Sequence, residues 1–308
     1  MPGNARSHII DEETSGYYHC INRCVRRAFL CGNDPYTGEN FDHRKSWFTE
    51  KIETLSEIFL IDIGNYAIMS NHYHINLRNR PDLVAKLCDR EVLIRWWKLF
   101  PGKIKPNTKE NKPPEYILNK WLEDSEFIEE RRKRLSSISW FMRCLNEFVA
   151  RRANREDRVT GRFWQGRFYS QALLDQEAVV QAAAYIDLNP FRAGLEKKLG
   201  TYQHSSLYER MKNKGMNRSS FLSTFSAVTT ALADEAPFLL LDEREYIDLV
   251  IFYASKQGQE QFKAIEKGFQ ASPTAVGSEE RLQKLANKIG KSRIKGLCLY
   301  SPIDLRES

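Results

Sequence analysis

The chain has 308 residues, with 47 Lys and Arg against 40 Asp and Glu, a formal net charge of +7 and a pI of about 9.0. A hydrophobic content of 42% is enough for a sizeable core, and no apolar run approaches the roughly 18 residues of a membrane helix, which excludes a membrane-spanning protein. The opening residues are polar and the chain is long, so we expect a cytoplasmic protein with reduced cysteines and a mild preference for a nucleic-acid partner.

Strand and helix patterns alternate in the first hundred residues. A first strand is predicted where aromatic and β-branched residues follow a glycine, and a helix follows where apolar residues recur at helical spacing. Two further strands are separated by the tight turn Ser70-Asn71, and a second helix comes after them. These elements are predicted at Tyr17 to Cys24, Lys45 to Phe59, Ile61 to Met69, His72 to Arg78 and Asp82 to Phe100.

A polar segment then interrupts the pattern. Pro101 to Pro114 is rich in Lys and Pro and has no periodicity, which is typical of an irregular excursion. A charged helix is predicted from Tyr116 to Arg134, so residues 101–135 form a polar and helical insert. Ser136 to Arg155 has a clear apolar stripe and predicts an amphipathic helix.

Strand character returns at the end of the segment Thr160 to Leu174, and a helix is predicted from Asp175 to Asn189. Asp175 is a favourable N-cap, and Pro190 is expected to stop the helix. The order strand, helix, strand, strand, helix, strand predicts an α+β fold with a ferredoxin-like antiparallel sheet.

Two domains are predicted. Residues 1–200 form the first, and residues 201–308 form a mostly helical C-terminal extension with a helix from Pro237 to Ala254. The last thirty residues form a basic tail. Two roles are open for it: it contacts DNA, or it only keeps the protein soluble. Its cations are Lys284, Lys288, Lys291, Arg293 and Lys295.

A histidine pair is the first sign of chemistry. His72 and His74 stand two residues apart on a predicted strand, so both imidazoles point to one face while Tyr73 points to the other. Neutral imidazole is a common ligand of divalent ions. Ile75 and Leu77 continue the strand on the side of Tyr73. The spacing alone leaves open a pair of histidines on a solvated sheet face.

Three blocks in order resemble the REP-associated tyrosine transposases and their insertion-sequence relatives, which are single-tyrosine HUH enzymes. Three ordered blocks are more specific than one histidine pair. The resemblance covers roughly the first two thirds of the chain. The blocks are Tyr17-Tyr18-His19-Cys20-Ile21-Asn22-Arg23, then Ala67-Ile68-Met69-Ser70-Asn71-His72-Tyr73-His74-Ile75-Asn76-Leu77, then Phe163-Trp164-Gln165-Gly166-Arg167-Phe168 followed by the stretch from Tyr185 to Leu195.

The resemblance implies a transposase-like enzyme that cuts and rejoins single-stranded or hairpin DNA. Mg²⁺ or Mn²⁺ is expected on His72, His74 and one more polar side chain, where it polarises the scissile phosphate. The tyrosine that matches the family's nucleophile is Tyr185, and Asn189, four residues later on the same helix face, is the expected third ligand. Tyr169 is the rival nucleophile.

The basic residues around these blocks are the expected DNA contacts, and an indole among them can stack on an unpaired base. A DNA substrate predicts a nucleoid-associated location. Relatives in the family include monomers and dimers, so a homodimer is an open alternative. Two other functions are also open: a catalytically inactive, transposase-derived DNA-binding protein, and an RNA-binding or RNA-processing protein on the same scaffold. The expected DNA-binding residues are Arg23, Arg27, Arg162, Trp164, Arg167 and Arg192.

Overall fold

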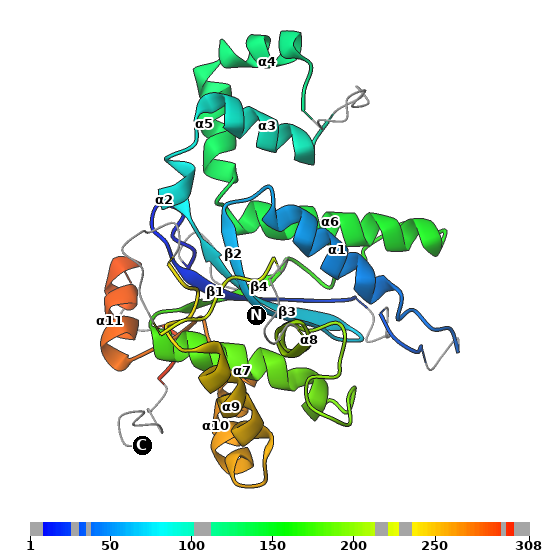
Figure 1. Ribbon diagram of the computed structural model, residues 1–308, viewed down its shortest axis with the longest axis vertical. Coiled ribbons are helices and arrows are strands. Elements are labelled where there is room, and N and C mark those ends of the chain that lie inside the picture. Colours follow the sequence, from blue (N-terminus) through cyan, green and yellow to red (C-terminus); the bar gives the residue numbers. More distant parts are fainter. Residues whose placement is uncertain are drawn as a thin grey trace.

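A six-stranded sheet runs through the middle of the molecule, with helices on both faces and a helical lobe beyond one end (Figure 1). The computed structural model describes residues 9–25, 31–34, 38–101, 112–212, 221–227, 236–290 and 294–298. Within these residues no helix is long and apolar enough to cross a membrane.

The four long strands are neighbours in the order β2-β3-β1-β4, and each pair is antiparallel. A helix joins β1 to β2 and helices join β3 to β4, which confirms the predicted ferredoxin-like α+β class. Two short strands that were not predicted extend the sheet in parallel beyond β4. The strands are β1 (Tyr17–Arg23), β2 (Ile61–Ile68), β3 (His72–Asn79), β4 (Tyr169–Leu173), β5 (Ala275–Val276) and β6 (Gly296–Leu297).

The helices form two layers and the lobe. Figure 1 shows α1 and α6 together on one face of the sheet, α7 on the other face with α9 and α10 beyond it, and α3, α4 and α5 in the lobe. The helices are α1 (Arg44–Ser56), α2 (Pro81–Val84), α3 (Asp89–Leu99), α4 (Glu115–Leu122), α5 (Ser125–Arg134), α6 (Ile138–Glu156), α7 (Gln176–Arg192), α8 (Ser206–Lys212), α9 (Glu243–Ala254), α10 (Gly258–Gln270) and α11 (Glu279–Lys288).

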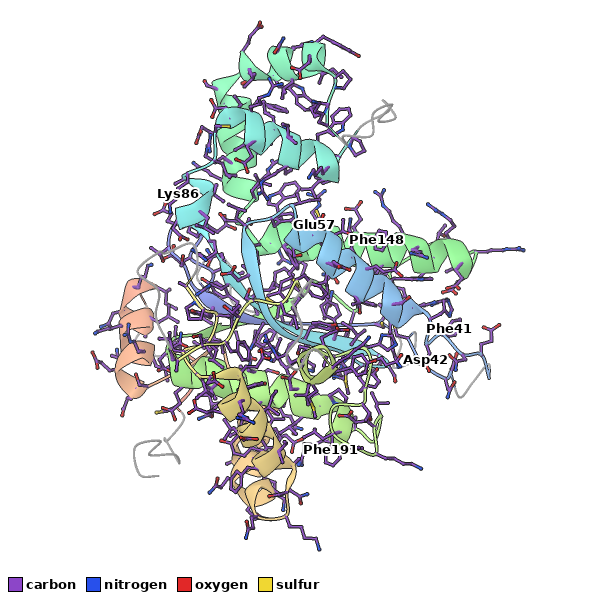
Figure 2. The ribbon with its side chains drawn as sticks, viewed as in Figure 1. Phe41, Asp42, Glu57, Lys86, Phe148 and Phe191 are labelled. Atoms are coloured by element: carbon purple, nitrogen blue, oxygen red, sulfur yellow. The ribbon has the colours of Figure 1, made fainter. Side chains whose placement is uncertain are left out.

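Strand alternation assigns the residues of β3 to the two layers. Tyr73, Ile75 and Leu77 are fully buried in the hydrophobic cluster that α1 and α6 share, as predicted. Phe148, which is labelled in Figure 2, packs against the same cluster from α6. The alternate residues of β3 point toward α7, so the neighbours of Tyr73 lie in a different environment from Tyr73 itself.

The prediction that Pro190 ends its helix was wrong, because α7 continues to Arg192. Proline removes one backbone donor, but the next turn still closes: the amide of Ala193 donates to the Asn189 carbonyl oxygen at 2.9 Å. The helix ends at Gly194, whose φ of +70° lets the following amides turn back onto the last carbonyl oxygens.

Two other helices predicted as continuous are each broken in two. The stretch from Asp82 to Phe100 splits into α2 and α3, and Arg132 of α5 donates to carbonyl oxygens of Val84 and Leu87 at 3.2 and 2.6 Å. These bonds satisfy acceptors that the break leaves open. The stretch from Tyr116 to Arg134 splits where the Asp124 side chain accepts from the amide of Phe127 and caps α5.

The C-terminal extension packs against α7. Its long helix begins at Glu243 and not at Pro237, because Asp242 and Glu245 form a capping box at that point. Phe238 and Leu239, just before the cap, are fully buried in the hydrophobic cluster that contains α7. Parts of several predictions lie outside the described residues: most of the excursion from Pro101 to Pro114, Arg27, and Lys291 and Arg293 of the basic tail.

Candidate active site

The side chains of the two histidines of β3 line one cavity. The ring centroids of His72 and His74 are 4.9 Å apart on the face that looks toward α7. His74 is buried and His72 is half-buried. Both line a cavity of about 540 Å³ together with Tyr185 of α7 and Arg23 at the end of β1. The predicted juxtaposition of two imidazoles on one sheet face is therefore present.

Hydrogen bonds assign the same tautomer to both rings. Nδ1 of His72 lies 2.6 Å from Oδ1 of Asn71, an acceptor, so Nδ1 carries the proton and Nε2 has a lone pair. A longer chain holds His74: Nδ1 of His19 donates to Oε1 of Gln171 at 2.6 Å, so Nε2 of His19 accepts from Nδ1 of His74 at 2.9 Å. Nε2 of His74 is thereby also unprotonated.

Nε2 of His74 is buried and has no hydrogen-bond partner among the described residues. A buried polar atom without a partner is costly, and a lone pair on a cavity wall is the donor that a metal ion requires. Burial lowers the pKa of His72 to about 4 and that of His74 well below its usual value, so both rings are neutral at pH 7. The residues therefore fit a divalent ion.

The set of ligands is incomplete with these two alone. The described residues contain no group of three His, Cys, Asp or Glu side chains that could hold a metal ion. The side-chain amides that line the cavity belong to Asn22, Gln165 and Gln270, and the expected third ligand, Asn189, is not among the lining residues. This residue is half-buried one turn after Tyr185, and its Nδ2 donates to the Tyr185 carbonyl oxygen at 2.8 Å.

Tyr185 faces the histidines across the cavity. Its ring meets His74 edge to face, with centroids 5.5 Å apart and an interplanar angle of 89°. On the other side Phe269 of α10 stacks on it at 5.0 Å and 15°. Burial raises the pKa of Tyr185 and the charge of Glu266 adds to the rise, while a side-chain hydrogen bond from Asn189 and the charge of Arg23 oppose it without reversing it. The last two interactions favour the phenolate that a nucleophile needs.

A buried carboxylate anchors the helix that carries Tyr185. Asp187, on another face of α7, accepts from Asn65 of β2 at 2.8 Å, Ser206 of α8 at 2.5 Å and Tyr246 of α9 at 2.5 Å. Burial raises the pKa of Asp187 although all three donors oppose the rise. These bonds join α7 to the sheet and to the C-terminal extension, and so hold Tyr185 in place.

The rival Tyr169 lines the same cavity from β4 but is engaged differently. Its hydroxyl lies 2.7 and 2.5 Å from the carbonyl oxygens of Ser272 and Pro273. Burial raises its pKa to about 12. Because burial raises the pKa of both tyrosines, the difference between them is geometric: the Tyr169 hydroxyl is held by backbone acceptors, whereas the Tyr185 ring packs against His74.

Two of the expected DNA-binding arginines reach the cavity. Arg23 and Arg167 both line it and both are exposed. Arg167 has no hydrogen-bond or ion-pair partner within the part of the chain that the structure describes. Exposed guanidinium groups at a cavity rim can neutralise phosphates.

The other expected DNA contacts lie elsewhere. Arg162 is exposed in a separate hollow of about 960 Å³ beside the end of α6. Trp164 is half-buried on the α6 face of the sheet. Arg192 forms a two-pronged ion pair with Glu266, at 2.9 and 2.7 Å, so its charge is already balanced. Arg27 lies outside the described residues.

Three residues of the site were not foreseen. Alternation along β1 and β4 places His19 and Gln171 on the face of His74, and this signal was available in the sequence. Phe269 belongs to the C-terminal extension, beyond the resembling blocks, and no pattern pointed to it.

Comparisons with known proteins add little. No family model matches the chain, and no curated protein matches it. A solved structure described as a REP-associated tyrosine transposase bound to a REP hairpin is similar, with 11% sequence identity over 72% of this chain and 94% of that chain and a TM-score of 0.38. An identity and a TM-score this low carry no inference about the function of this chain.

Proposed function

We propose that this protein is a transposase-like enzyme that nicks and rejoins single-stranded or hairpin DNA, with Tyr185 as the nucleophile. One observation carries the proposal: two imidazoles with unprotonated Nε2 atoms and the side chain of Tyr185 line a single cavity together with Arg23 and Arg167. The resemblance of the three sequence blocks points to the same chemistry.

The cleavage step balances as a transesterification. The Tyr185 oxygen attacks the phosphorus, the bond between phosphorus and the 3′ oxygen breaks, and the phenol proton ends on the departing 3′ oxygen. The products are a 5′-phosphotyrosine on the protein and a free 3′-hydroxyl on the DNA. Mg²⁺ or Mn²⁺ on His72, His74 and Asn189 would polarise the phosphate and offset its charge. Arg23 stabilises the phenolate and neutralises phosphate charge on the cavity rim.

Rejoining is the reverse step with another strand end. A 3′-hydroxyl attacks the phosphotyrosine, the bond to the tyrosine oxygen breaks, and the phenol regains a proton. The bond energy is kept in the covalent intermediate, so no nucleoside triphosphate is required.

The test is the covalent adduct itself. Full-length protein is incubated with hairpin oligonucleotides and Mn²⁺, and the adduct is located by mass spectrometry. We expect an adduct on Tyr185 that is absent in Tyr185→Phe and retained in Tyr169→Phe. An adduct that persists in Tyr185→Phe and disappears in Tyr169→Phe would reverse the assignment.

The assay also separates the other functions. DNA binding of normal strength with no adduct in Mg²⁺ or Mn²⁺ would identify an inactive DNA-binding protein. Stronger competition by RNA than by DNA oligonucleotides of the same sequence would favour the RNA-directed alternative.

A further inference from the structure

A second hollow lies on the opposite face of the sheet from the catalytic cavity. It has a volume of about 410 Å³, within the range of small-molecule sites, and lies between α6 and the loop that precedes β4. Figure 1 shows that α6 and α7, which border the two hollows, lie on opposite faces of the sheet. The hollows nevertheless share three lining residues, Asn22, Gly166 and Arg167, so both open beside the same turn.

The wall of this hollow is rigid. Nε1 of Trp164 donates to the Asn146 carbonyl oxygen at 2.9 Å, and its ring meets Phe163 and Tyr73 edge to face at 4.8 and 5.7 Å. The Asn146 amide oxygen accepts from Asn22 at 3.0 Å and from Tyr73 at 2.8 Å. These amides are therefore occupied, and the lining offers an aromatic wall in a preformed pocket.

Gly166, at the shared edge, has no structural reason to be glycine in the free chain. A Cβ added there would meet no heavy atom within 4 Å, and its φ is not in the left-handed region. Glycine is favoured where another backbone must approach closely. Gly166 lines both hollows, and the space in front of it is open.

Cations stand at both ends of the pocket. Arg167 borders it at the turn, and Arg143 of α6 borders the far side with 62% of its side chain exposed. The Arg143 guanidinium lies 3.8 Å from the Glu147 carboxylate, so its ion pair is loose. Glu147 also lines the pocket, and its charge is offset by Arg143 and by Arg151, so the lining keeps a net positive charge. Cations beside an aromatic wall are the arrangement that binds single-stranded nucleic acid.

We propose that this pocket holds one unpaired nucleobase of the substrate strand, while the neighbouring phosphate lies in the catalytic cavity and the sugar–phosphate backbone crosses Gly166. The inference rests on the proposed function, because it assumes that a DNA strand enters that cavity. Trp164 supplies the stacking surface, and Arg143 and Arg167 contact the adjoining phosphates or the base edge.

The test measures binding and not cleavage. In the Tyr185→Phe background, fluorescence anisotropy is recorded with hairpin oligonucleotides in which a single abasic site is moved along the unpaired flank. We expect one position where loss of the base weakens binding about tenfold or more, the size of one base–aromatic contact. Adding Ala150→Leu, which fills the pocket from α6, should weaken binding of the intact strand equally and make the abasic scan flat.

Arg143→Ala and Arg151→Ala form a matched pair. Both arginines lie on α6 and pair with Glu147, but only Arg143 borders the pocket. We expect Arg143→Ala to weaken binding several-fold and Arg151→Ala to leave it near the parent value, with equal melting temperatures. A flat abasic scan in the parent protein, or an unchanged scan profile in the Ala150→Leu variant, overturns the pocket. Because no cleavage is measured, failure to form a Tyr185 adduct leaves this result intact.

Discussion

The two faces of β3 treat their polar groups in opposite ways. On the α6 face, the Tyr73 hydroxyl donates to the Asn146 amide oxygen, which also accepts from Asn22, while Trp164 donates to the Asn146 carbonyl oxygen. On the α7 face, Nε2 of the next residue, His74, is buried and has no hydrogen-bond partner among the residues that the structure describes. Two adjacent residues of β3 thus differ: the hydroxyl of Tyr73 has its hydrogen-bond partner, and Nε2 of His74 has none among the described residues.

The difference distinguishes groups that build the fold from groups that act on a ligand. A buried donor or acceptor without a partner costs free energy, and one that belongs to a residue lining a cavity can be completed by a ligand. The network around Tyr73 stabilises the packing of α6, whereas the chain from Gln171 through His19 to His74 ends in a lone pair at a cavity.

The largest effect on DNA cleavage is expected from separate substitutions of the adjacent residues His72 and Tyr73, only one of which is a predicted metal ligand. His72→Ala removes a metal ligand and should lower the DNA cleavage rate by roughly 1,000-fold, since metal-ion charge stabilisation is several kcal/mol. Tyr73→Phe removes one buried hydrogen bond and should cost about 1 kcal/mol of unfolding free energy while cleavage stays near normal. Cleavage rates and urea unfolding of both variants check the pair; normal cleavage by His72→Ala refutes the metal role.

Substituting Gln171, which holds His74 through His19, should have an intermediate effect on metal-dependent cleavage. Gln171→Leu leaves Nδ1 of His19 without its acceptor, so the tautomer of His74 is no longer held. Such support usually contributes 10- to 100-fold to metal affinity or activity, so we expect about that shift in the Mn²⁺ concentration for half-maximal cleavage. Ser170→Ala, the neighbour that faces the other layer, is the control and should leave the curve in place. Equal Mn²⁺ dependence of cleavage in the two variants would show that Gln171 contributes to packing and does not support metal binding.

The smallest expected effect is on the way the free energy of unfolding changes with pH. Burial lowers the pKa values of His19 and His72 to about 4 from 6.5. Their contribution to stability is fully present above pH 6.5 and is lost as the pH falls through 4, because the unfolded chain takes up protons first. Urea unfolding between pH 8 and 4 should show this fall, and His19→Leu should make it shallower. An identical slope in that variant would be inconsistent with a buried neutral His19.

Local patterns were enough for the frame of the fold and for part of the site. The alternation around His72, Tyr73 and His74 predicted which side chains share a face, because a strand repeats every two residues whatever packs against it. The order strand, helix, strand, strand, helix, strand predicted the ferredoxin-like sheet, because each element was visible from its local hydrophobic pattern. The prediction for Pro190 failed because a proline near a helix end costs one bond, and the glycine four residues later was the stronger signal.

The sequence by itself determined that two imidazoles point to one face of a strand and that Tyr185 lies on the last helix of the predicted ferredoxin-like core, since both follow from residue spacing. Tertiary structure alone decided that His19 and Gln171 orient His74, that Phe269 stacks on Tyr185, and that a second pocket shares Gly166 with the first. These contacts join residues 55 to 152 positions apart in the sequence. Packing brings such residues together, and no local period encodes it.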